Sequence, residues 1–270
     1  MPPPTQTYAN DHSTPVLRTH NWRTLSNSAS YLFPYLQPNT HILDVGCGPG
    51  SITIDLAKHV LPHGRVVGVE YVSDPLPAAQ SLADAEGVSN VSFQVGDIHA
   101  LPFEDESFDV VHAHQVLQHI ADPVAAVREM RRVVKKGGIV AVRESASLTW
   151  YPDSEGIEAW VKLGERMRRA RGANPHPGRM LHVWAKEAGF ERERIKTGAG
   201  TWCFSTPEER EYWGGSMEER MRSSGFARDA LRDGFASAED LDGMARAWRA
   251  FVEDDDAWFG LLHGEVLCWK

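Results

Sequence analysis

The stretch Leu43-Asp44-Val45-Gly46-Cys47-Gly48-Pro49-Gly50 decides the fold class of this chain. It follows an apolar, β-rich segment at 41–45 and precedes a helical pattern at 51–60, which is the context of a nucleotide-binding loop. Gly46 and Gly48 permit positive φ angles and let a ligand approach the backbone closely. The helix that follows offers unpaired N–H groups and the positive end of its dipole to the same ligand.

The details of this loop indicate which kind of nucleotide it binds. Its spacing is GxGxG, whereas dinucleotide-binding proteins use GxGxxG, and Asp44 lies at the end of the strand before it. A carboxylate there would repel a pyrophosphate and attract a cation. A nucleoside with an amino group, a sulfonium and no phosphate fits the loop better, and S-adenosylmethionine (SAM) is that molecule.

Acidic residues also follow the next two predicted strands. Glu70 ends the segment at 65–70, where a carboxylate can accept both ribose hydroxyls. Asp97 follows the segment at 91–95, where it can accept from the adenine amino group. Each acid taken alone is equally consistent with a helix N-cap or a solvated loop. Three successive strands that end in a suitable residue favour a SAM site.

Around the loop, strand and helix patterns alternate. The apolar, β-rich segments lie at 41–45, 65–70, 91–95, 108–112 and 139–143, and the helical patterns between them at 51–60, 74–86 and 123–134. This alternation predicts a parallel sheet wound on both faces. After Glu144 the rhythm breaks: helical patterns lie at 156–171, 179–188, 207–213, 217–223 and 238–252, and β-like segments at 195–204 and 258–269. Residues 16–37 carry a further helical pattern, with breaks at Pro34 and Pro38.

The composition excludes several classes of protein. With 270 residues, 24% charged and 42% hydrophobic, the chain is neither disordered, collagen-like nor a coiled coil. Its net charge of −9 disfavours nucleic acid as a partner, so we interpret the basic run at 166–171 as a solvated helix face. No apolar run reaches the length of a membrane span and no signal-peptide pattern is visible, which predicts a cytoplasmic protein. The oligomeric state stays open.

Three motifs together resemble a known family. They are LDVGCGPGSITIDLA at 43–57, VVGVE at 66–70 and VGDIHALPFEDESFDVVHAHQVLQHIADPVAAVREMRRVVKKGGIVAV at 95–142. Over about 41–144 the chain is similar to class I SAM-dependent methyltransferases, of the type that includes the ubiquinone/menaquinone-biosynthesis C-methyltransferases. The similarity is weak before this region and after it.

The resemblance implies a Rossmann-like, doubly wound α/β sheet of seven strands, mostly parallel with an antiparallel last strand. It implies a single domain over 1–270, whose SAM-binding core is 41–144. Residues 1–40 would form an N-terminal arm and lid helix, and 195–204 and 257–270 a late hairpin. The segments at 145–194 and 205–256 would form a helical substrate cap.

The resemblance also implies roles for residues at the cofactor. Asp44, Gly46 and Gly48 would hold the methionine end, with Cys47 in the same loop. Glu70 would bind the ribose, with Tyr71 beside the adenine, and Asp97 and Ile98 would read the adenine. His114 would face the methionine moiety through its backbone, next to Gln115. Many relatives have Asp where this chain has Glu70, and Glu reaches the same hydroxyls.

Arg23 belongs to the N-terminal segment, which often covers the bound cofactor in such enzymes. Its guanidinium can form a bidentate pair with the cofactor carboxylate. The alternative is an ordinary surface arginine.

Methyl transfer from a sulfonium is an in-line displacement, and it needs a base only when the nucleophile carries a tightly held proton. His119 is the first candidate base, and its alternative is a structural histidine. His114 is the second, with a backbone-only contact as its alternative. Glu144 is the third, and its alternatives are a solvated carboxylate or a partner for Arg143.

The segment after Glu144 is rich in aromatic residues: Trp150, Tyr151, Trp160, Trp184, Trp202, Tyr212 and Trp213. Together they indicate a small apolar or aromatic substrate, although ordinary packing explains any one of them. His176 and His182 can add polar contacts, and their spacing does not favour a metal site. We therefore expect a SAM-dependent methyltransferase of a small metabolite. The alternatives are a non-methylating cyclisation or rearrangement on the same fold, and a non-catalytic SAM-binding regulator.

Overall fold

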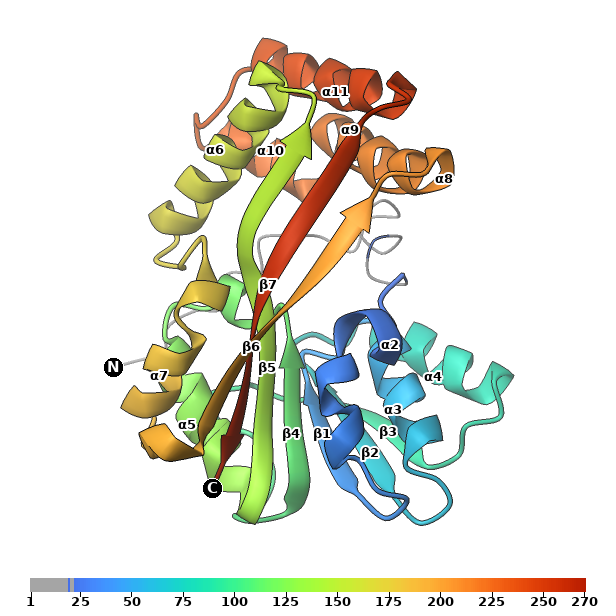
Figure 1. Cartoon of the computed structure of the whole chain (residues 1–270), viewed down its shortest axis with the longest axis vertical. Helices are drawn as coiled ribbons and strands as arrows, with labels where there is room; N and C mark the ends of the chain where they lie inside the picture. Colours follow the sequence, from blue (N-terminus) through green and yellow to red (C-terminus); the bar gives the residue numbers. More distant parts are fainter. Residues whose placement is uncertain (1–18, 20–21) are drawn as a thin grey trace.

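The computed structural model describes Thr19 and residues 22–270, which form a seven-stranded sheet with flanking helices (Figure 1). The strands are β1 His41–Val45, β2 Arg65–Glu70, β3 Val91–Val95, β4 Phe108–His114, β5 Val134–Tyr151, β6 Ile195–Phe204 and β7 Trp258–Trp269. Their order in the sheet is β3-β2-β1-β4-β5-β7-β6. The first five strands are parallel, and β7 runs antiparallel between β5 and β6. The predicted fold class is confirmed.

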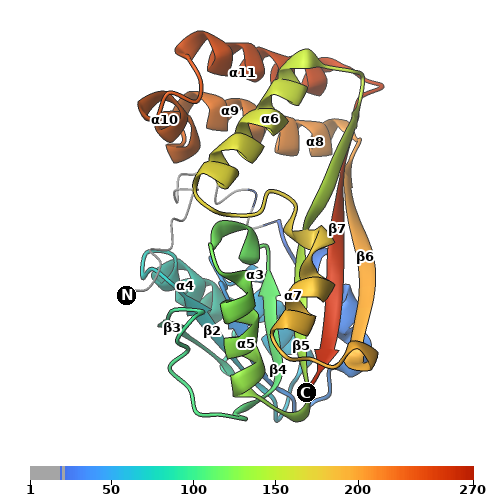
Figure 2. The ribbon, with the colours of Figure 1, turned by 90° about the vertical axis from the view of Figure 1, so that its left-hand side faces the viewer.

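Helices cover both faces of this sheet (Figure 2). They are α2 Leu25–Ser28, α3 Ser51–His59, α4 Leu76–Ala85, α5 Pro123–Val133 and α7 Leu181–Glu187. On one face α3 buries Ile54 and Leu56 together with apolar residues of α2 and α4. On the other face α5 buries Met130 and α7 buries Trp184. Each helix has one apolar side, and the sheet covers it.

The remaining helices form a cap beyond the carboxyl ends of the strands. They are α6 Glu155–Ala170, α8 Pro207–Arg210, α9 Ser216–Ser223, α10 Gly225–Arg232 and α11 Ala238–Glu253. Figure 1 shows the long strands β5, β6 and β7 bending out of the sheet to reach these helices. There Trp248 of α11 and Phe259 of β7 are fully buried in one apolar cluster. The sheet and the cap therefore share strands.

In its described part, the segment before β1 is helical in two short pieces. The helical pattern at 16–37 yields α2 and then a 3-10 turn at Ser30–Tyr35, which contains Pro34. Proline lacks the N–H that would continue an α-helix. Most of the residues before Trp22 lie outside the described part of the chain.

Two predictions of local structure are wrong. β5 runs from Val134 to Tyr151 instead of 139–143, because its second half pairs with β7 as far as Tyr151 opposite Trp258. We expected α7 in the cap segment at 145–194, and it instead packs against α5 and the sheet. No helix in the described part of the chain is long and apolar enough to cross a membrane.

Candidate active site

One cavity of about 450 Å³ joins the glycine loop to the cap. Its lining includes every residue that we predicted for the cofactor or for catalysis except Asp97 and Glu144. The cap contributes residues of α6 and α9 to the same lining. The carboxyl edge of the sheet and the cap therefore face each other across a common space.

The glycine loop presents its backbone to this cavity. Gly46 has φ 71°, and a Cβ there would collide with the side chain of Val116. Gly48 has φ 52°, and a Cβ there would meet no atom within 4 Å. The fold therefore requires glycine at position 46, while position 48 is open toward a ligand.

The carboxylate of Asp44 is held in place from two sides. Its Oδ1 lies 2.7 Å from Nδ1 of His112, and its Oδ2 accepts a hydrogen bond of 2.6 Å from the Thr53 hydroxyl. Asp44 lies opposite His112 in the pairing of β1 with β4. The side chain is buried, so these two partners fix its orientation at the cavity wall.

Glu70 lies on the cavity at the end of β2. Its Oε2 accepts from the backbone N–H of Gly48 at 3.0 Å, and its Oε1 accepts from that of Tyr71 at 2.8 Å. Each carboxylate oxygen can accept more than one hydrogen bond, so both stay usable by a ligand. The glutamate thus connects the glycine loop to the end of the neighbouring strand.

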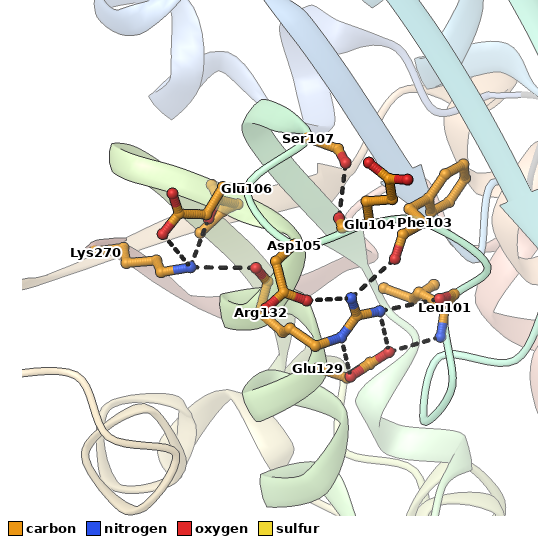
Figure 3. A network of polar contacts seen from close by, with 10 residues as sticks. Leu101, Phe103, Glu104, Asp105, Glu106, Ser107, Glu129, Arg132 and Lys270 are labelled. Atoms are coloured by element: carbon orange, nitrogen blue, oxygen red, sulfur yellow. Dashed lines mark hydrogen bonds and ion pairs between the residues drawn. The ribbon is translucent and has the colours of Figure 1, made fainter.

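The segment between β3 and β4 supplies Ile98 to the cavity, whereas Asp97 lies off its lining. Oδ1 of Asp97 accepts from the backbone N–H of His99 at 2.9 Å. A polar network anchors this segment to the end of α5 (Figure 3). In it, Arg132 donates to the carbonyls of Leu101 and Phe103 at 3.0 and 2.8 Å.

The same arginine forms ion pairs at 2.7 Å with Asp105 and with Glu129, and Figure 3 shows both. Lys270 donates to the carbonyl of Arg132 at 3.1 Å, which ties the last residue of the sequence to this network. These contacts hold the wall that contains Ile98.

Arg23 is part of the cavity wall, which argues against the alternative of an ordinary surface arginine. Its Nη2 donates to Oε1 of Gln115 at 2.9 Å. The Gln115 amide nitrogen lies 2.8 Å from Nε2 of His263 on β7. Gln115 has φ 55°, which turns the chain sharply after β4. Gln115 therefore links the segment around Arg23 to β7.

His119 lines the cavity at the end of a 3-10 turn over Leu117–His119. Burial lowers its pKa to about 3, with smaller contributions from the charges of Arg168, Arg23 and Arg171. The imidazole is therefore neutral at pH 7 and can accept a proton, although its basicity is weak in this environment.

Glu144 lies off the cavity, and both of our alternatives for it are wrong. The side chain is fully buried, and Arg143 pairs with Glu265 at 3.2 Å instead. Its Oε1 accepts from the backbone N–H groups of Val116 and Leu117 at 2.7 and 2.6 Å. Burial raises the pKa of this carboxyl to about 8. The geometry fits a residue that holds the turn before His119.

The ring of His114 packs within the late hairpin. Its centroid lies 5.6 Å from that of Trp202 and 6.1 Å from that of His263. Both ring nitrogens are buried without a hydrogen-bond partner among the described residues, and burial lowers the pKa well below its usual value. This packing places the ring among aromatic groups of the sheet.

The aromatic cap residues divide into two groups. Trp150, Trp160 and Trp213 line the cavity. The others pack elsewhere or face solvent: Trp184 lies in the sheet core, Trp202 and Tyr212 pack against Trp22, and Tyr151 is 52% exposed.

The two histidines of the cap also differ. His176 lines the cavity with its Nε2 3.0 Å from Oε1 of Glu165, whereas His182 is exposed and off the lining. The described residues contain no group of three or more histidine, cysteine or acidic side chains that could hold a metal ion.

Comparison with known proteins identifies the family. Residues 36–192 match a family model described as a methyltransferase domain. An uncharacterised methyltransferase of Schizosaccharomyces pombe is 36% identical over 272 aligned residues, which cover 97% of this chain and 96% of that protein. The chain belongs to the SAM-dependent methyltransferases.

Further relatives agree with this assignment. The demethylmenaquinone methyltransferase of Lactococcus lactis is 36% identical over 121 residues, which cover 45% of this methyltransferase and 48% of that protein. The structure of Haemonchus contortus phosphoethanolamine N-methyltransferase 2 with S-adenosylhomocysteine (SAH) superimposes with a TM-score of 0.57 at 21% identity. The superposition covers 93% of this chain and 52% of the Haemonchus chain. The predicted family resemblance, enzyme class and cofactor are confirmed.

The residues of the methyltransferase fit SAM at the glycine-loop end of the cavity. A ligand there meets the open backbone at Gly48, the fixed carboxylate of Asp44 and the two oxygens of Glu70. The acids suit the cationic and hydroxyl groups of SAM and would repel a pyrophosphate.

Sequence reasoning missed several residues of this site. Thr53 and His112 hold Asp44, and their only sequence signal is their place on the neighbouring helix and strand. In the basic run, Arg166 and Arg169 are exposed as predicted, whereas Arg168 and Arg171 line the cavity. That solvated-face interpretation is wrong for half of the run.

Proposed function

We propose that this methyltransferase transfers the methyl group of SAM to a small molecule whose apolar or aromatic part lies against the cap. The observation that supports this proposal most directly is one continuous cavity of about 450 Å³, which runs from the glycine loop to Trp150, Trp160 and Trp213. Its volume and its mixture of aromatic walls with a few polar groups are typical of small-molecule sites.

For the cofactor, we assign the amino and carboxylate end to Asp44, Arg23 and the backbone of the glycine loop. Glu70 binds the ribose hydroxyls, while Tyr71 and Ile98 flank the adenine. Bound SAM supplies an activated methyl group, so the protein contributes alignment and the exclusion of water.

His119 is our candidate proton acceptor, because it lies on the cavity wall and is neutral at pH 7. A base is needed only if the attacking atom carries a proton. Glu144 lies off the cavity lining, so we assign it to positioning the turn before His119.

The test uses SAM labelled in its methyl group together with fractions of a small-molecule extract. The account predicts SAH formation and one labelled small product. An acceptor that changes without SAH formation would indicate a cyclisation or rearrangement. SAM binding without any turnover in any fraction would indicate a regulator, and label found only in macromolecules would contradict the proposal.

A further inference from the structure

Helix α6 brings two guanidinium groups to the cavity wall. Arg168 and Arg171 are three residues apart and both line the cavity, whereas their neighbours Arg166 and Arg169 face solvent. Residues at this spacing share one face of a helix. Gly164, one turn earlier, leaves space for the first group, since a Cβ there would lie 3.0 Å from Nη1 of Arg168.

The protein itself leaves much of this positive charge uncompensated. The side chain of Arg168 makes no hydrogen bond or ion pair with any described residue, and burial lowers its pKa. Arg171 gives Nη2 to Asp229 at 2.7 Å, but its Nη1 is buried without a partner in the described part of the chain. An enclosed guanidinium stays charged, and leaving its donors unsatisfied costs free energy.

Nearby acidic groups do not remove this charge. Glu165 is the carboxylate that acts on Arg168, and its two oxygens already lie 3.0 Å from His176 and 3.5 Å from Arg169. Arg179 and Arg220 also line the cavity. The part of the lining that comes after Glu144 in sequence therefore holds four arginines and one acid, Glu165, in a protein whose net charge is −9.

We propose that the methyl acceptor carries an anionic oxygen group, a carboxylate or a phosphate, which Arg168 and Arg171 bind through charge-assisted hydrogen bonds. This inference rests on the proposed function, since it names the class of acceptor for the same site. It narrows the acceptor to an amphipathic molecule with an anionic group at the end of α6 and an aromatic body against Trp160.

The two arginines line the same cavity as His119, our candidate base. Both lie near enough to His119 for their charges to lower its pKa. A bound anion would therefore neutralise the positive charge of Arg168 and Arg171 beside the candidate base. Arg23, on the lid segment and bonded to Gln115, is the separate group that we assign to the cofactor carboxylate.

The test measures binding to the SAH-loaded protein by calorimetry and NMR, with benzoate, phenyl phosphate and neutral methyl benzoate as probes. We expect at least one anionic probe to bind roughly tenfold or more tightly than methyl benzoate. Preference for benzoate would point to a carboxylate acceptor, and preference for phenyl phosphate to a phosphate. Equal binding of all three probes would overturn the inference.

Variants of α6 show which arginine is responsible for the preference for anionic probes. Arg168→Met should remove the preference for the anionic probe while SAH affinity stays unchanged, and Arg168→Lys should restore part of it. Arg169→Met, on the solvent side of the same helix, is the matched control and should keep the preference. A preference retained in Arg168→Met, or a loss of SAH affinity instead, would overturn the inference. Because these titrations need no turnover, they fail separately from the methyl-transfer assay.

Discussion

The cavity has a cofactor end at the glycine loop and a cap end at α6. The two ends differ in how far the protein itself provides partners for their polar side chains. At the cofactor end, each acidic side chain has partners within the protein: Asp44 contacts His112 and Thr53, and Glu70 accepts from two backbone N–H groups. At the cap end, the side chain of Arg168 forms no hydrogen bond or ion pair with a described residue, and only the more distant charge of Glu165 acts on it. The cofactor end is organised before the ligand arrives, while the cap end leaves donors for the ligand to satisfy. The first arrangement suits an invariant cofactor, and the second suits a specific substrate.

The largest expected effect on cofactor binding comes from a substitution in the glycine loop. Gly46→Ala should weaken SAH binding about 100-fold or more, because the added Cβ collides with Val116 and forces the loop to move. Calorimetric titration with SAH measures it. Gly137→Ala is the matched control. Gly137 has the same left-handed backbone conformation, but it lies near the beginning of β5, at the edge of the sheet opposite the glycine loop. It should lose stability without losing SAH affinity, and equal losses of affinity in both variants would contradict the account.

A variant of His119 tests whether this residue accepts a proton from the methyl acceptor, between the cofactor end and the cap end of the cavity. His119→Ala should lower turnover about 10²-fold if the acceptor must lose a proton. SAH affinity should stay within about twofold, because we place this residue at the acceptor. With a pKa of about 3, the wild-type imidazole should contribute no ionisation to the turnover profile between pH 6 and 8. A variant with normal turnover would exclude the base role.

A variant of Arg132 tests whether the cavity wall that contains Ile98, which we assign to the adenine, depends on the network of Figure 3. Arg132→Met should lower the melting temperature by about 2–8 °C, because it breaks two ion pairs and frees two backbone carbonyls. Differential scanning calorimetry measures this, with the exposed Arg128→Met as control. Cofactor affinity should fall more than acceptor affinity, and the opposite order would break the distinction between the two ends.

Glu144→Gln is expected to have the smallest effect. The amide oxygen can still accept from the N–H groups of Val116 and Leu117, so turnover should stay within about threefold of wild type. Glu144→Ala leaves both donors buried and unpaired, and it should lose more activity than the amide variant. Steady-state kinetics on both variants separate the roles: inactivity of Glu144→Gln alone would show that the carboxylate does chemistry.

The sequence predicted which residues gather at the glycine-loop end of the cavity, because their signals are contiguous. A strand, a glycine loop and a helix follow one another, and Glu70 ends the next strand, so spacing alone indicates that they meet at one edge of the sheet. The bounds of β6 and β7 were also predictable from their apolar, β-rich sequence. The length of β5 was not, because its second half exists through pairing with a strand more than a hundred residues later.

The cap end depends on the rotation of helices, which sequence fixes weakly. Arg168 was predictable in principle, since Trp160, Gly164 and Arg168 recur every four residues and all line the cavity. The net negative charge and the four clustered arginines favoured a solvated face instead. Which aromatic residues line the cavity likewise depends on tertiary packing, as Trp184 in the sheet core shows.

The most direct test of the central claim, that the cofactor and the acceptor occupy opposite ends of one cavity, is a crystal structure with SAH and the tighter-binding anionic probe. The account predicts the SAH ribose hydroxyls within hydrogen-bond distance of Glu70, and the probe's anionic group on Arg168 with its ring against Trp160. The SAH carboxylate on Arg168, or a ribose away from Glu70, would contradict it.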